Sequence, residues 1–386
     1  MNRLIIVGNG FDLAHGLPTS YCDFIKWYIK NAFKKATEEG THKDDLLIVI
    51  CEDPTAVYQY NSFTNSDQMV DFFLKKIGLH ELIFLKTDKI IIDGRRYNFP
   101  FKITIPGKSN LLQKIILEID KLGWVDVELE YYSILKEILN TTTEPYKIKE
   151  KLTEINSSLS ELSEQLLTYL NTLDKPKAIE SIRTKIYSEI KEPDFLITKS
   201  DQQENDIKSD ELKNITFLNF NYTSTINQYV TNYWYREYHK MASINIINIH
   251  GQINDKSKYP IVFGFGDELD EDYKRMENSK IKGYFQHAKS FAYFQNHSYS
   301  DLVRFIESDK FQVFIFGHSC GLSDRTLLNM IFEHDNCKSI KIYYHKFEDG
   351  TTTFRETTEE ISRHFKDKVK MRNRVVNFEI SKALVD

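Results

Sequence analysis

The residues of this chain that could do chemistry gather in short motifs, and the first motif stands at the N-terminus. The apolar run Leu4 to Val7 is followed by Gly8-Asn9-Gly10-Phe11-Asp12 and then by His15-Gly16-Leu17-Pro18. Glycines after a buried strand let the backbone approach a phosphate, and the N–H groups of the next helix point at the anion. The pattern predicts a nucleotide-binding loop, although a tight turn without a ligand would use the same glycines.

Further polar motifs follow apolar runs later in the chain. Asn221-Tyr222 ends one run, His250-Gly251 ends a second, and Gly317-His318-Ser319 ends a third, with Asp324 close behind. Because the carboxyl ends of parallel strands line one crevice, we expect these side chains to meet the glycine loop there. Ser319 and Asp324 would hold a ribose in such a crevice, or Asp324 would merely cap the next helix.

The elements that must position these motifs predict an α/β fold, a Rossmann-like, mostly parallel sheet with a large, mainly helical insertion. Strand-glycine motifs occur only near the two chain ends, so residues 1–35 and 214–386 are expected to form the core and 36–213 the insertion. A hairpin is expected near 86–101, where Asp93-Gly94 separates apolar runs. The expected strands are 215–221, 244–249, 260–266, 311–316 and 339–345, and the first helix of the nucleotide unit is expected over 23–33.

Composition excludes several classes of protein. The chain has 386 residues, 41% hydrophobic and 28% charged, which is typical of a soluble globular protein, and its net charge of -5 gives no drive toward nucleic acid. Its four cysteines lie far apart without a CxxC pair, so we expect no bound metal, no disulfide framework and a reducing cytoplasm. No apolar run is long enough to span a membrane, and no signal peptide is expected.

Two features of the insertion allow more than one interpretation. After Pro145, apolar residues recur at helical spacing in a short heptad-like stripe, which predicts packing inside the chain or, as the alternative, a homo-oligomer. Trp124, Asp126 and Glu128 crowd a helix junction. They would form a capped turn or reach over the nucleotide pocket.

Together these motifs carry a resemblance to known families. The opening Val7-Gly-Asn-Gly-Phe-Asp-Leu, the segment Trp124 to Glu128 and Phe316-Gly-His-Ser319 closely resemble the bacteriophage abortive infection protein AbiH family. The order of the glycine loop, Asn221, His250 and Gly317-His-Ser319 is also similar to the sirtuin-like NAD-binding fold. This resemblance implies anti-phage defence, with NAD or a related dinucleotide as ligand and a phage-derived trigger as partner.

By matching motifs, the resemblance implies catalytic roles for Asn221 and His250 and cofactor contacts for the glycine loop. It implies cleavage of the nicotinamide–ribose bond of NAD, which arrests the infected cell. The sequence departs from sirtuins because position 12 is Asp rather than Ser, Thr223 replaces an Asp of NAD-hydrolysing relatives, and the CxxC zinc module is missing. Lysine deacylation is therefore not expected.

Two alternatives stay open at this point. Gly317-His318-Ser319-Cys320-Gly321 matches the G-x-S-x-G nucleophile elbow and predicts a serine hydrolase with His345 or His364 as base. The other alternative is a nucleotide-sensing defence module that binds its ligand without turnover.

Overall fold

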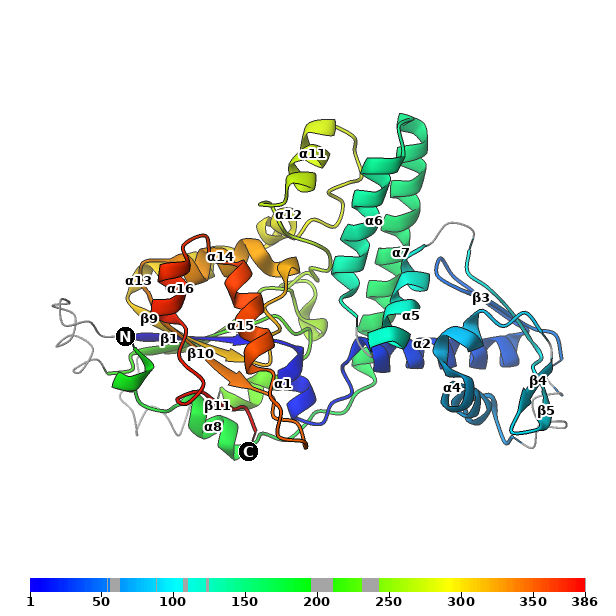
Figure 1. Cartoon of the computed structure of the whole chain (residues 1–386), viewed down its shortest axis with the longest axis horizontal. Coiled ribbons are helices and arrows are strands. Elements are labelled where there is room, and N and C mark those ends of the chain that lie inside the picture. The colour runs from blue at the N-terminus through cyan, green and yellow to red at the C-terminus, as the bar shows by residue number, and fades with distance from the viewer. Residues whose placement is uncertain are drawn as a thin grey trace. The chain divides into compact units, whose positions relative to one another are not determined.

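The chain folds into two compact units in a computed structural model that describes residues 1–53, 55, 63–87, 89–106, 110–122, 125–195, 211–230 and 243–385 (Figure 1). Unit 1 comprises Met1–Thr19, Leu173–Lys274 and His287–Asp386, and unit 2 comprises Ser20–Thr172 and Arg275–Gln286. The sequence placed residues 20–35 in the core and residues 173–213 in the insertion. In the structure, residues 20–35 lie in unit 2 and residues 173–213 lie in unit 1.

Unit 1 is built on a six-stranded sheet in the order β11-β10-β9-β1-β7-β8, in which every neighbouring pair is parallel. Its central strands β1 and β9 are buried along their whole length, which explains why they are apolar apart from Asn2, Arg3 and Gln312. The α/β class predicted from the sequence is confirmed. The strands are β1 (Asn2–Val7), β7 (Asn214–Asn219), β8 (Ser243–Asn248), β9 (Phe311–Phe316), β10 (Cys337–Tyr344) and β11 (Lys382–Ala383).

Helices cover both faces of this sheet (Figure 1). On one face, Phe11 of α1 (Asn9–Ala14) and Ile182 of α8 (Glu180–Ile186) pack with Ile5 and Val7 of β1. The other face is covered by α13 (Ser298–Ser308), α14 (Arg325–Glu333) and α15 (Phe354–Arg363). The remaining helical segments of unit 1 are η1 (Glu192–Asp194), η2 (Thr225–Tyr229), η3 (Ile253–Asp255), α12 (Lys289–Ala292), η4 (Tyr293–Gln295), η5 (Leu322–Asp324) and α16 (Lys368–Arg374), while α11 (Glu271–Ser279) runs from unit 1 into unit 2.

The strand order places a switch point beside β1. From β1 the sheet continues through β7 and β8 in one direction and through β9, β10 and β11 in the other. In open parallel sheets, ligands bind outside the carboxyl ends of the strands where the order reverses. The segments after β1, β7, β8 and β9 therefore lie at the edge of the sheet where the sequence motifs predict a ligand site.

A buried polar group, here called the Asp194 tether, fastens the segment before β7 to the sheet. Asp194 of η1 binds Lys341 of β10, with 2.6 Å between Oδ1 and Nζ. Arg3 of β1 donates to Oε1 of Gln312 and, at 2.7 Å, to the carbonyl of Ile186. Burial lowers the pKa of Arg3 to about 10. All four side chains of the tether, Arg3, Asp194, Gln312 and Lys341, are at least 96% buried.

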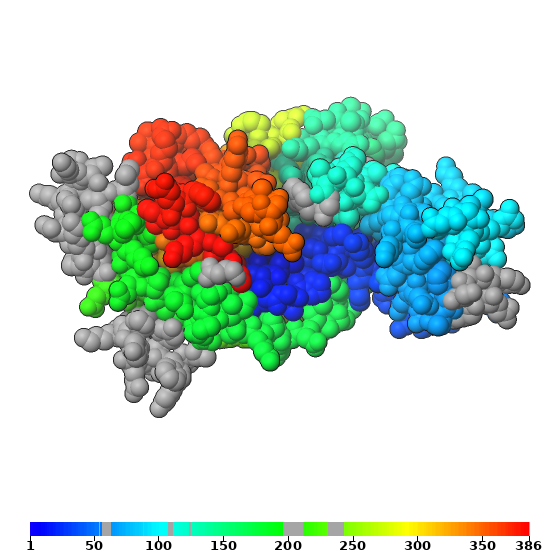
Figure 2. Space-filling view, turned by 60° about the horizontal axis from the view of Figure 1, so that its bottom comes forward, coloured from blue at the N-terminus to red at the C-terminus, as the bar shows by residue number. Residues whose placement is uncertain are grey.

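The chain end closes over the same segment. Figure 2 shows the red C-terminal residues against the green segment that contains α8, and Lys185 donates a hydrogen bond to the carbonyl of Leu384. This contact joins α8 to the residue after β11.

Unit 2 combines helices with two small antiparallel sheets. The sheet β2-β3-β6 is separate from the hairpin β4-β5, which turns at Asp93-Gly94 with positive φ at both residues as sequence analysis expected. The stripe after Pro145 lies on α7, where Leu152, Ile155 and Leu159 are buried within this unit. The elements are α2 (Tyr21–Glu39), β2 (Thr41–Lys43), β3 (Ile48–Cys51), α4 (Ser66–Ile83), β4 (Lys89–Ile92), β5 (Arg95–Asn98), β6 (Phe101–Thr104), α5 (Asn110–Leu122), α6 (Val127–Thr141) and α7 (Pro145–Asn171).

Two predictions about local structure were wrong. Residues 260–266 form no strand, and only Phe265 makes an isolated bridge, to Ala288. The run is apolar because this loop is buried from Val262 to Gly266, and a short apolar run does not distinguish a buried loop from a strand. The first helix after β1 is α1 rather than the segment 23–33, which belongs to α2 of unit 2.

Candidate functional site

The glycine loop after β1 packs tightly against the turn after β9. A Cβ atom on Gly8 would lie 2.5 Å from Cα of His318, and one on Gly10 would lie 2.8 Å from the carbonyl oxygen of Gly317. Gly317 itself has a φ of +67°, and a Cβ there would lie 2.2 Å from the Phe11 nitrogen. These glycines therefore bring two loops into backbone contact.

The amide groups of the loop are also engaged. The N–H groups of Gly8, Gly10 and Phe11 donate to the carbonyls of Phe316, Gly317 and Gly8, respectively. These three amides are thus not available to a phosphate in this conformation. Of the other predicted contacts, Asn9, Gly16 and Pro18 are exposed, Gly16 having a φ of +76° in an open turn, while Phe11 is buried in the core under α1.

Asp12 lies inside α1, whose N-cap position is Gly8. The carboxyl group is 1% exposed, and its Oδ2 accepts a hydrogen bond from Thr223 Oγ1 at 2.6 Å. Oδ1 is buried and has no well-directed hydrogen-bond donor. Burial raises the pKa of Asp12, against the lowering effect of hydrogen bonding by Thr223.

Asn221 links the end of β7 to the glycine loop. Its side-chain Nδ2 donates to the carbonyl of Gly8 at 3.0 Å, and its backbone N–H donates to Oδ1 of Asn219. Asn219 in turn donates to Oδ1 of Asn248 at the end of β8. Hydrogen bonds therefore join the segments at the carboxyl ends of three adjacent strands, β1, β7 and β8.

Asp324 is the centre of a buried group that we call the Asp324 cluster, formed with Lys289, His250 and His318. Its Oδ1 lies 2.8 Å from Nζ of Lys289 and 3.1 Å from Nε2 of His250, and its Oδ2 lies 3.6 Å from Nε2 of His318. All four residues are at least 93% buried. Despite this burial, the neighbouring Lys289 and His250 hold the pKa of Asp324 far below its ordinary value. Asp324 occupies the N-cap position of α14, as the alternative interpretation expected, but its side chain makes no capping hydrogen bond.

Both imidazoles of the cluster are neutral. Nδ1 of His318 accepts the backbone N–H of Cys320 at 2.9 Å, so its proton sits on Nε2, which faces Asp324. Burial lowers the pKa of His318 to about 4. Burial also lowers the pKa of His250, with Lys289 acting in the same direction.

The two nitrogens of His250 have different surroundings. The backbone of Phe220 hydrogen-bonds the ring, while Nε2, although close to Asp324, makes no well-directed hydrogen bond. A neutral ring that carries its proton on Nδ1 has its lone pair at Nε2. A proton arriving there would form an ion pair with Asp324.

Sequence reasoning missed two members of the cluster. His318 belongs to the motif Gly317-His318-Ser319, but no function was predicted for it. Lys289 lies in the segment 288–293, where no sequence pattern indicates a functional residue. Lys289 is placed by its backbone, whose N–H donates to the carbonyl of Phe265. The buried loop 262–266 is what brings it to Asp324.

The nucleophile elbow does not form a catalytic triad in the described residues. Ser319 is exposed, and the positive φ falls on Cys320 rather than on the serine. Nε2 of His364 contacts the carbonyl of Cys320 at 2.7 Å, and His345 lies exposed next to Phe347. A triad needs a histidine in hydrogen-bond contact with the serine hydroxyl, and no such bond is found in this part of the chain.

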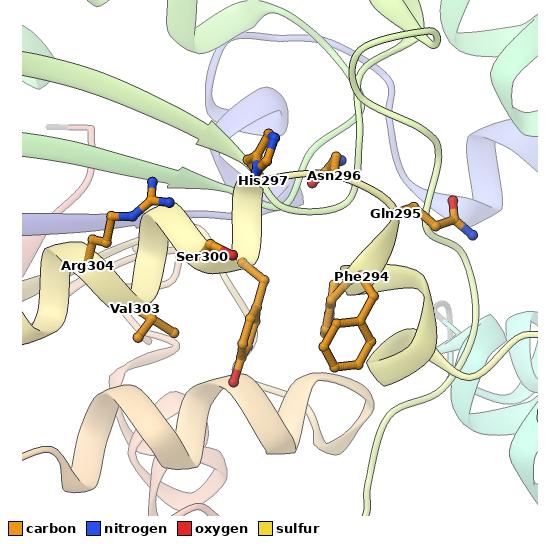
Figure 3. A pocket seen from close by; sticks show the side chains of 9 residues that line it. Phe294, Gln295, Asn296, His297, Ser300, Val303 and Arg304 are labelled. Atoms are coloured by element: carbon orange, nitrogen blue, oxygen red, sulfur yellow. The ribbon is translucent and has the colours of Figure 1, made fainter.

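A hollow of about 620 Å³ opens near the cluster and is lined by residues of the segment 293–304. Figure 3 shows Phe294 and Gln295 from η4 beside Ser300, Val303 and Arg304 from α13. None of the predicted site residues lines it. It meets the cluster through Tyr293, whose ring stacks with that of His250 at 6.5 Å between centroids.

The remaining predictions concern the helix junction near Asp126, metal binding and membrane spanning. Trp124 lies outside the described residues, Asp126 caps α6 by accepting from the Leu129 N–H, and Glu128 is buried in the first turn of α6. In the ranges that the structure describes, no three His, Cys, Asp or Glu side chains are grouped as metal ligands. Within the same ranges, no helix combines the length and apolarity needed to cross a bilayer.

Comparison with known proteins identifies the family. Residues 4–346 match the family model described as Bacteriophage abortive infection AbiH. No curated protein and no solved structure matches the chain. The match covers most of the sequence, and the chain belongs to this family, which implies a role in anti-phage defence.

Proposed function

We propose that this AbiH-family chain defends the cell by hydrolysing the nicotinamide–ribose bond of NAD, or of a close relative, at the carboxyl ends of β1, β7 and β8. One observation carries the proposal. Two deeply buried polar atoms, Oδ1 of Asp12 and Nε2 of His250, lack a well-directed hydrogen bond, and they follow β1 and β8, the two strands on either side of β7. Buried polar atoms are rarely left unpaired in folded proteins, and the exceptions need an explanation such as a ligand.

Hydrolysis of this bond requires only a few protein side chains. The C1′–N bond breaks with its electron pair leaving on nicotinamide, and a water oxygen bonds to C1′ of the positively charged sugar. Nε2 of His250 takes the proton of that water, and Asp324, 3.1 Å away, stabilises the imidazolium. Asn221 orients the sugar or the water.

The proposal differs from a phosphate-cradle mechanism in one respect. Because the amides of Gly8, Gly10 and Phe11 already have carbonyl partners, the glycine loop supports the site by packing on Gly317 and His318. Ser319, exposed beside this turn, is left to contact a distal part of the dinucleotide.

The test is nicotinamide release from NAD by the purified protein, together with phage protection in cells. His250→Ala should abolish both, and His345→Ala is the matched control, because His345 is exposed and lies outside the cluster. Release of nicotinamide by His250→Ala at the wild-type rate contradicts the assignment. Loss of activity in His345→Ala, with labelling of Ser319 by a serine-directed probe, would favour the hydrolase alternative instead.

A further inference from the structure

Asp12 is the buried carboxyl group whose environment is least complete. Its Oδ2 accepts from Thr223, whose hydroxyl in turn lies 3.3 Å from that of Thr225. Thr225 and Asn221 lie near enough to lower the pKa of Asp12, but neither directs a good hydrogen bond to Oδ1. Oδ1 is closed off from solvent, so bulk water does not satisfy it.

Asp44 of unit 2 shows what a structural carboxylate looks like in the same chain. Its Oδ1 accepts the N–H groups of Leu46 and Leu47 at 2.9 and 2.8 Å, its Oδ2 contacts Nε2 of His42 at 2.9 Å, and the Tyr28 hydroxyl lies 2.9 Å from both oxygens. These hydrogen bonds lower the pKa of Asp44 despite its burial, whereas burial dominates at Asp12. Asp44 holds a loop together, and Asp12 lacks such a set of donors.

The place of Asp12 tells what kind of donor is missing. Asp12 follows β1 on α1, and Asn221 follows the adjacent β7. The Nδ2 group of Asn221 donates to the Gly8 carbonyl, and its Oδ1 has no hydrogen bond among the described residues, so Asp12 and Asn221 each keep one oxygen without a directed hydrogen bond. Two acceptors on neighbouring strands match two adjacent hydroxyl donors.

We propose that Oδ1 of Asp12, together with Oδ1 of Asn221, binds the vicinal hydroxyl groups of a ribose. The inference rests on the proposed function, and it assigns the nicotinamide-side ribose to these two oxygens. Asp12 is thus a substrate-binding residue that lowers the free energy of unfolding of the unliganded protein. A buried acceptor without a hydrogen bond is unfavourable until the ligand donates one.

The experiment compares NAD with analogues lacking the 2′- or the 3′-hydroxyl of the nicotinamide-side ribose. Binding is measured calorimetrically with the full chain in a His250→Ala background, so that no ligand is consumed. We expect the background protein to bind at least one deoxy analogue about tenfold more weakly than NAD, as for the loss of one hydrogen bond. Adding Asp12→Asn, which puts a donor amide in place of Oδ1, should weaken NAD binding and remove the preference.

The matched control is Asp44→Asn, which should keep the preference for NAD. Without ligand, Asp12→Asn should melt no lower than the wild type, whereas Asp44→Asn should melt lower.

The outcomes separate the two proposals. If NAD and both analogues bind equally well, or if Asp12→Asn keeps the preference, the ribose assignment is overturned while the proposed function stands. A loss of thermal stability in Asp12→Asn as large as that in Asp44→Asn also overturns it, because Oδ1 would then have a structural partner. If the background protein and the wild type bind none of the three compounds, the proposed function fails and the assignment fails with it.

Discussion

The Asp194 tether and the Asp324 cluster both bury an aspartate against a lysine, yet their surroundings differ. In the tether, Asp194 binds Lys341, and Arg3 reaches Gln312 and the carbonyl of Ile186, while Nε2 of Gln312, near the start of β9, has no directed hydrogen bond. In the cluster, one carboxylate is shared by Lys289 and two neutral imidazoles, and Nε2 of His250 is left without a directed hydrogen bond. This comparison indicates that a buried charged group is not by itself evidence of a functional site. The mark is hydrogen-bonding capacity left unused at the carboxyl ends of parallel strands.

The largest expected effect separates the two aspartates by activity. Asp324→Asn should lower nicotinamide release by roughly 10²- to 10⁴-fold, because the imidazolium of His250 loses its counter-charge. Asp194→Asn should leave the activity per folded molecule unchanged. The measurement is product formation from NAD, normalised to the folded fraction seen by circular dichroism. Equal losses in the two variants would erase the distinction between tether and cluster.

The second prediction concerns stability of the tether. Lys341→Met removes one partner of a buried pair and leaves Asp194 unpaired, which should lower the free energy of unfolding by about 3–5 kcal/mol. Chemical denaturation measures this loss.

The double variant Asp194→Leu with Lys341→Met is the control for this prediction. It removes both charges, and its stability should lie within about 1–2 kcal/mol of the wild type. A double variant as unstable as Lys341→Met would show that shape, rather than the unpaired charge, sets the cost.

A third prediction uses the neutral histidine of the cluster. The pKa of His318 is about 4 in the folded chain and 6.5 when unperturbed, so between these values the unfolded chain binds more protons than the folded chain. Stability should therefore fall as pH drops from about 6.5 and level off near 4, by up to about 3 kcal/mol for this residue.

Denaturation series across this pH range measure the effect. His364, whose pKa burial also lowers to about 4, adds to it. His318→Gln should flatten the slope, and an unchanged slope in that variant would contradict a neutral His318.

Much of unit 1 follows from sequence because most of its strands are largely buried and therefore contain short apolar runs. The strands β1, β7, β8, β9 and β10 were expected nearly where they lie, and β11, two residues long, gave no signal. The strand predicted over 260–266 was wrong because a buried loop and a buried strand have the same composition. The motif residues His250, Asn221 and Asp324 were found because each closely follows a strand.

The rest of the site depends on contacts between segments far apart in sequence. Lys289 reaches Asp324 only because the Phe265 carbonyl binds its backbone, and no local pattern encodes that bond. Gly8 and Gly10 were expected to face a phosphate. Glycine is required at these positions because the backbone of Gly317, about 300 residues away in sequence, lies too close for a Cβ atom. The NAD and sirtuin-like parts of the resemblance stay predictions.

The smallest expected effect refines the comparison between the two lysines. Lys289 lowers the pKa of His250, whereas Lys341 lies in the tether and is not among the groups that shift it. Lys289→Met should therefore raise the pKa of His250, and the acid limb of the profile of kcat/KM against pH should move to higher pH, since the base must be neutral to take a proton. Lys341→Met should leave the limb in place. The profiles are measured as initial rates of nicotinamide release on folded protein. A downward shift in Lys289→Met, or equal shifts in both variants, would mean that His250 is not the group whose protonation limits the reaction.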